Sequence, residues 1–151
     1  MNRLGISMTK ERFFVPANGP DVNAVQIAVN ALELLCEKHH SNGLVCVPAL
    51  KHAEDTVLNR VWAEKHIKSL SSGKVVKINE HYGVSMCSPF TLKNHHSAPV
   101  ILALFASKDM VEKVEKSWGC KALVVVPWIP GDTESWVKSY APTVLSLPKN
   151  G

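Results

Sequence analysis

The feature that most constrains the fold is a junction that occurs three times: a segment with helical periodicity, then a glycine, then an apolar run. Glycine is favoured just past the end of a helix because the chain there commonly turns left-handed. Short helix-to-strand connections are typical of α/β domains. The three junctions together predict a chain that alternates helices and strands. The glycines are Gly43, Gly73 and Gly119, and the runs that follow them are 44–50, 74–78 and 122–129.

Four segments carry apolar residues at helical spacing. Asp21 is a suitable N-cap for the first, and Ser107 for the third. In the third segment Glu112 and Lys116 are spaced as an i,i+4 pair on the outward face. The expected helices run from 22 to about 40, from about 53 to 70, from 108 to 118 and from about 132 to 141.

The strand pattern favours a sheet that is mainly parallel. The runs VILALF and LVVV are almost continuously apolar, as in strands covered on both faces. Only residues 79–83 separate two of the expected strands, too few for a parallel crossover, so an antiparallel hairpin near a sheet edge is expected there. The expected strands are 44–50, 74–78, 84–88, 100–105 and 123–129, with 12–15 as a further candidate.

These elements predict a three-layer α/β sandwich with a mixed, mainly parallel sheet of about five strands. A chain of 151 residues is expected to form a single domain over 1–151, with loose ends at 1–11 and 148–151. The arrangement would be Rossmann-like, but without the dinucleotide fingerprint, because no two glycines are two residues apart.

Motifs for phosphate, nucleophile and metal chemistry fail on spacing. The stretch SSGK at 71–74 lacks the first glycine and the hydroxyl residue of a phosphate-binding loop, and 83–87 matches only half of a nucleophile elbow. Cysteines and histidines gather between Cys36 and His52, but no tight pair of ligands occurs. We predict no metal and no cofactor, and the sequence leaves open whether the protein is an enzyme.

Four cysteines in or beside apolar stretches indicate reduced, buried thiols and a reducing compartment. The longest apolar runs, 98–106 and 122–129, are shorter than the ~20 residues that a membrane helix needs. The expectation is a cytoplasmic protein without a membrane partner. Its net charge of +4 is too small to favour nucleic acid, and the lysines of 108–116 alternate with acidic residues.

Open α/β sheets bind ligands beyond the carboxyl ends of their parallel strands, often at helix N-termini. Three expected loops fall there and would share one rim of the sheet. A small anionic or planar ligand is the expected partner of this rim. The candidate ligand-binding residues are Lys51, His52, Ser107, Lys108, Trp128, Asp132 and Thr133.

The alternative is a protein–protein interaction module that acts as a homodimer. Four tryptophans are many for this length, and Trp118 and Trp136 fall on segments expected to flank the sheet. Surplus apolar area on those helices could form a two-fold contact. The same tryptophans could also simply fill the core.

Overall fold

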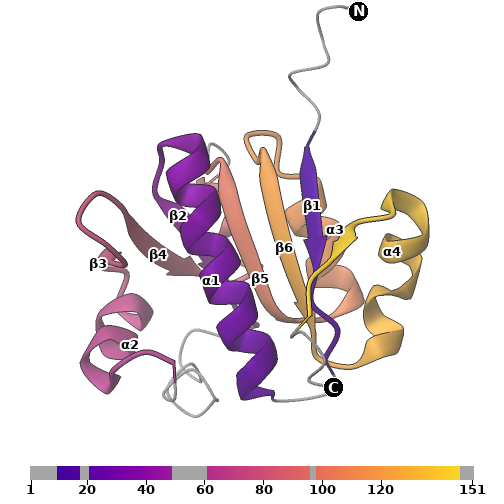
Figure 1. Cartoon of the computed structure of the whole chain (residues 1–151), viewed down its shortest axis with the longest axis horizontal. Helices are drawn as coiled ribbons and strands as arrows, with labels where there is room; N and C mark the ends of the chain where they lie inside the picture. Colours follow the sequence, from indigo (N-terminus) through magenta and orange to yellow (C-terminus); the bar gives the residue numbers. More distant parts are fainter. Residues whose placement is uncertain (1–9, 18–20, 49–60, 96–97, 147–151) are drawn as a thin grey trace, which may run out of the picture.

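The computed structural model describes residues 10–17, 21–48, 61–95 and 98–146, and it shows an α/β chain with one mixed sheet (Figure 1). Within these residues the sheet has seven strands, and four α-helices accompany it. In chain order the elements are β1 (Glu11–Phe14), α1 (Val22–His39), β2 (Gly43–Cys46), α2 (Glu64–Ser71), β3 (Val76–Lys77), β4 (Gly83–Cys87), the 3₁₀ turn η4 (Leu92–His95), β5 (Val100–Ala106), α3 (Lys108–Glu115), β6 (Ala122–Pro127), the 3₁₀ turn η5 (Pro130–Thr133), α4 (Glu134–Tyr140) and β7 (Thr143–Val144).

The strand order across the sheet is β3-β4-β2-β5-β6-β1-β7. Every neighbouring pair is parallel except β3 with β4, which form an antiparallel hairpin at one edge. The mainly parallel sheet and the edge hairpin are therefore confirmed. Because the other strands run in one direction, the carboxyl ends of β1, β2, β4, β5 and β6 lie along a single edge of the sheet.

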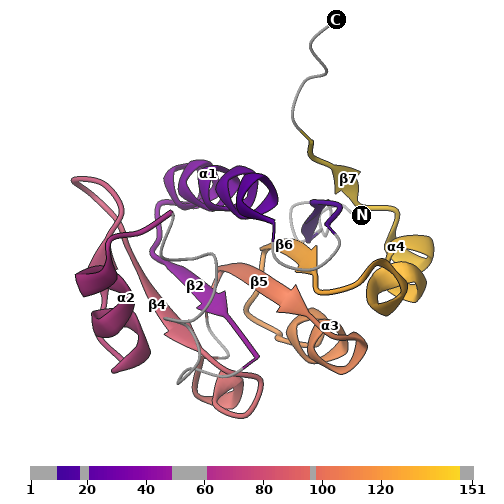
Figure 2. The same ribbon diagram turned by 90° about the horizontal axis from the view of Figure 1, so that it is seen from below.

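The strands bury alternate residues in two separate cores. One core holds Leu32 of α1 and Ile67 of α2 against one face of the sheet. The other holds Met110 of α3 and Trp136 of α4 against the opposite face. Figure 2 shows the same division, with α1 on one side of the sheet and α3 on the other. Every residue of β5 and β6 is buried, as the continuous apolar runs predicted.

The expected count of about five strands is wrong. The candidate strand at 12–15 does form, as β1, and it inserts between β6 and β7. Strand β7 was not expected at all, since it contains only two residues, both exposed, directly after Pro142. The second expected helix begins later than predicted: α2 starts at Glu64, after an extended Ala63, so residues 61–63 are not helical. Residues 49–60 lie outside the described part of the chain.

The helix-to-strand junctions exist, but glycine caps only one of the helices. Gly73 follows α2 with a φ of 92°. The left-handed residue after α1 is His40, whose φ is 49° and whose N–H bonds to the carbonyl of Cys36. Gly43 lies inside β2 instead, where a Cβ atom would come within 2.8 Å of Leu32. Helix α3 ends at Glu115, well before Gly119, and Lys116 after it is right-handed.

No helix in the described part of the chain is both long and apolar enough to cross a membrane. All four cysteines carry free thiols and are buried. These thiols fill apolar space on both faces of the sheet, with Cys36 in one core and the other three in the second.

Two leucines of α1 test which side of this helix faces the sheet. Leu32 is 0% exposed and Leu34 is 70% exposed. We expect Leu32→Ala to lower the free energy of unfolding by about 2–5 kcal/mol, because it leaves a cavity in the core. The same change at Leu34 should stay within about 0.5 kcal/mol. Urea denaturation at neutral pH measures both, and equal losses would contradict the orientation of α1.

Candidate functional site

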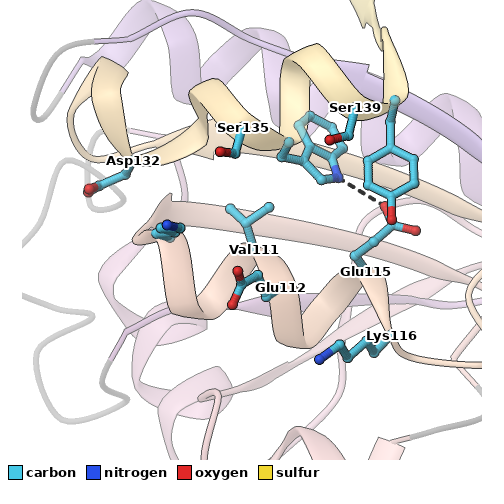
Figure 3. Close-up of a pocket in the computed structure, with 10 residues that line it drawn as sticks. Val111, Glu112, Glu115, Lys116, Asp132, Ser135 and Ser139 are labelled. Carbon is cyan, nitrogen blue, oxygen red and sulfur yellow. Dashed lines mark hydrogen bonds between the residues drawn. The ribbon is translucent and has the colours of Figure 1, made fainter.

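The structure brings two of the predicted site residues together in one groove. Lys108 begins α3, directly after β5, and Asp132 lies in η5, after β6. Both line a hollow of about 290 Å³ between α3 and α4 (Figure 3). The other residues that line it are Val111, Glu112, Glu115, Lys116, Ser135, Trp136, Ser139 and Tyr140.

The remaining predicted residues lie elsewhere or are already engaged. Ser107 caps α3, since its Oγ accepts a hydrogen bond from the N–H of Met110 at 3.3 Å. Thr133 is fully buried, and its hydroxyl donates to the carbonyl of Pro130. Trp128 is 44% exposed and packs edge-on against Phe105, with ring centroids 5.7 Å apart. Lys51 and His52 lie outside the described residues.

The floor of the groove is apolar and its walls are polar. Val111 and Trp136 are buried beneath it, whereas Ser135 and Ser139 are exposed on α4. Figure 3 shows Asp132 at one end and Glu115 at the other, with Val111 between them. A groove of this kind offers a hydrophobic contact surface bordered by groups that can fix an orientation, as small-ligand sites do.

At the amino edge of the sheet, the groove is closed by a cluster of charged residues around Glu115. Arg12 of β1 donates from Nε and Nη2 to the two carboxylate oxygens, each at 2.8 Å. The indole Nε1 of Trp136 donates to Oε1 at 2.9 Å. Lys10 reaches both the carboxylate, at 3.3 Å, and the backbone carbonyl of Glu115, at 2.6 Å. The Arg12 guanidinium also lies 4.2 Å from the ring centre of Tyr140, in a cation–π arrangement.

The cluster keeps Glu115 ionised. Burial alone raises the pKa of this carboxyl, but hydrogen bonds from Arg12 and Trp136 and the charges of Lys10 and Arg12 outweigh it, so the pKa lies below its usual value. The hydrogen bond to Glu115 raises the pKa of Arg12, although burial opposes this. A carboxylate with so many donors is a structural anchor. It is too well compensated to serve as an acid or base.

The backbone is strained near the end of β5, shortly before α3 begins. Phe105 is buried and has a φ of 56°, a conformation that is unfavourable for a bulky residue. It is the extra residue of a β-bulge, since Leu104 pairs with Val126 and Ala106 pairs with Pro127. The bulge turns Phe105 toward the α1 side of the sheet, so that Ala106 faces the α3 side. Such strain is concentrated at functional sites in many proteins.

Sequence reasoning missed most of the groove. It assigned Glu112 and Lys116 to an outward ion pair, but among the described residues the i,i+4 ion pairs within α3 and within α4 are Asp109–Lys113 at 3.4 Å and Glu134–Lys138 at 3.7 Å. Glu112 and Lys116 line the groove instead. The i,i+4 spacing of Ser135 and Ser139 was the available signal, because it places both hydroxyls on one side of α4.

The surroundings of the buried cysteines do not activate their thiols as nucleophiles. The neighbouring Cys87 thiol, together with burial, raises the pKa of Cys46 far above its usual value. Burial raises the pKa of Cys36 and of Cys120 to about 11. Thiols in this state are poor nucleophiles. Within the described part of the chain, no group of three or more His, Cys, Asp or Glu side chains could hold a metal ion.

A second hollow, of about 250 Å³, lies on the amino side of β2 and β4. Ser85 and His95 both line it, but no hydrogen bond joins them in the part of the chain that the structure describes. Ser85 lies within β4, so the half-matched nucleophile elbow is a strand. Without a base in contact with the hydroxyl, this hollow is a weaker candidate than the groove between α3 and α4.

No protein-family model matches the chain, and comparison with curated proteins and with solved structures finds no significant match.

The anchoring role of Glu115 gives a pH-dependent prediction. Glu115→Gln should lower the free energy of unfolding by about 2–4 kcal/mol at pH 7, because Arg12 and Lys10 lose their counter-charge while remaining partly buried. The folded pKa is depressed, so the wild-type carboxylate stabilises the fold above the unfolded value of about 4.3 and loses this effect as the pH falls through its folded pKa. The gap between the two proteins should therefore close in acid.

Urea denaturation between pH 7 and pH 3 measures this gap. Glu112→Gln is the matched control, since Glu112 is an exposed neighbour on α3 without an ion pair in the described structure. Its effect should be small at every pH. A gap for Glu115→Gln that does not change with pH would contradict an ionised anchor.

Proposed function

We propose that this chain is a small-ligand-binding domain of three-layer, Rossmann-like architecture, and that its ligand occupies the groove between α3 and α4 at the carboxyl edge of the sheet. The observation that carries the proposal is the meeting of Lys108 and Asp132 in one hollow. These residues follow β5 and β6, which are adjacent parallel strands. Ligand sites of open α/β sheets occur beyond the carboxyl ends of such strands.

The size and lining of the groove support this use. Its volume of about 290 Å³ is at the lower end of the range typical of small-molecule sites, roughly 300–1,000 Å³. A buried tryptophan and valine form its floor, and charged or hydroxyl side chains form its rim. The expected ligand is accordingly small, with a planar or apolar part and at least one charged group.

We place this activity in the cytoplasm. The support is the four free cysteines, all buried, which are typical of a protein that folds under reducing conditions.

The homodimer alternative retains one supporting observation. Trp136 is 5% exposed and fills the core, so it offers no surface to a partner. Trp118, just past α3, is 77% exposed. Size-exclusion chromatography with light scattering at tens of micromolar protein tests whether a second copy covers this ring. A homodimer would have twice the monomer mass of 16.6 kDa, and Trp118→Ser would restore the monomer mass. We expect the monomer mass for both proteins, and a dimer that Trp118→Ser dissociates would favour the alternative.

Ligand binding is tested by NMR with a library of metabolites that includes nucleotides, sugar phosphates and amino acids. We expect hits to shift the indole N–H resonance of Trp136 and the amides of residues 108–111 and 132–136. Ser135→Trp should abolish these shifts, because Ser135 is exposed and the larger side chain would fill the groove. Ser72→Trp, at the exposed end of α2, is the matched control and should bind as the wild type does.

Thermal melting of both tryptophan variants verifies that each remains folded. Hits that shift only resonances far from the groove would overturn the proposal, as would a library without hits.

A further inference from the structure

At the carboxyl edge of the sheet, the groove is lined by one cation, Lys108, and one anion, Asp132, which do not form an ion pair. Lys108 stands on α3 and Asp132 on η5, and no salt bridge joins them in the described structure. The neighbouring charges are arranged differently, because Asp109 pairs with Lys113 on α3 and Glu134 with Lys138 on α4. Lys108 and Asp132 are thus available for a ligand at this end, and Glu112 and Lys116 add two further charges along the α3 wall.

The environment of Lys108 favours a carboxylate. It is the first residue of α3, where the positive end of the helix dipole adds to the charge of the lysine. In the first turn of α3, the Oγ atom of Ser107 accepts a hydrogen bond from the N–H of Met110 only. Asp132, on the opposite wall, offers carboxylate oxygens that suit an ammonium group.

The floor beyond these charges suits an apolar side chain. Val111 is 1% exposed and lies between Asp132 and Glu115 in Figure 3. Trp136 is 5% exposed and donates its indole N–H to Glu115 at the closed end. The α3 wall extends from Lys108 to Lys116, which corresponds to about 12 Å of helix.

We infer that the groove binds a zwitterion that carries a carboxylate, an ammonium group and an apolar side chain, that is, a free α-amino acid with an aromatic or large aliphatic side chain. This inference rests on the proposed function of the same groove. The carboxylate lies against Lys108, the ammonium group against Asp132, and the side chain on Val111 and Trp136. Glu112 and Asp132 disfavour a ligand with several negative charges, such as a nucleoside triphosphate.

Three probes of nearly equal shape test the charge requirement. L-phenylalanine has both charges, 3-phenylpropanoate lacks the ammonium group, and 2-phenylethylamine lacks the carboxylate. Titration followed by the Trp136 indole resonance gives each affinity. For a shallow, exposed groove we expect L-phenylalanine to bind with a Kd on the order of a millimolar, and each of the other probes at least about fivefold more weakly.

Two variants assign the charges to residues. Lys108→Ala should weaken L-phenylalanine and 3-phenylpropanoate by about fivefold and leave 2-phenylethylamine unchanged. Asp132→Asn should weaken L-phenylalanine and 2-phenylethylamine and leave 3-phenylpropanoate unchanged. Lys113→Ala on α3 and Glu134→Gln at the start of α4 are the matched controls, since each removes a charge outside the groove and should leave all three affinities unchanged.

The outcomes separate the two proposals. Equal binding of L-phenylalanine and 3-phenylpropanoate would overturn the zwitterion inference, as would equal effects of the groove variants and their controls. If no probe binds but another member of the metabolite library shifts the groove resonances, the inference fails and the proposed function stands. If nothing shifts them, both fail.

Discussion

The architecture depends on the complete burial of β5 and β6. Their side chains point alternately to the two faces of the sheet, and all of them are removed from water. Two covered faces require helices on both sides, which α1 and α2 supply on one face and α3 and α4 on the other. Parallel pairing accompanies this burial, because α1 returns the chain from β1 to the start of β2 and α3 returns it from β5 to the start of β6. The loops that follow these parallel strands therefore all lie along the carboxyl edge of the sheet.

Strand β1 differs from β5 and β6, because all four of its residues are only partly buried. It pairs with β6, yet its first residues are charged and turn to opposite faces. Glu11 meets Lys38 and His39 at the end of α1, at 2.6 and 2.8 Å. Burial raises the pKa of Glu11, but these two partners lower it below the usual value. Arg12 meets Glu115 on the other face. One short strand thereby ties a helix from each face to the sheet at its amino edge.

Local patterns carried much of the fold. The apolar runs of β5 and β6 predicted doubly buried strands, and the short loop before β4 predicted the hairpin, since both properties are written in consecutive residues. Left-handed caps were harder, because His40 adopts the conformation that glycine favours while Gly43 is needed for close packing against Leu32. The anchor at Glu115 was beyond reach. Its helix appears evenly charged in sequence, and its partners Lys10 and Arg12 are about a hundred residues away.

The position of the groove follows from the order of the strands. Helix α3 joins neighbours β5 and β6, whereas α4 leads from β6 past β1 to β7, so the two helices lie side by side with their N-termini at the carboxyl edge. Arg12 of the intervening strand fills the space between their far ends, together with Glu115 and Tyr140. In the part of the chain that the structure describes, no side chain fills the space between the near ends in this way, and Lys108 and Asp132 line the groove there. The insertion of β1 therefore explains both why the groove exists and why it is closed at the Glu115 end.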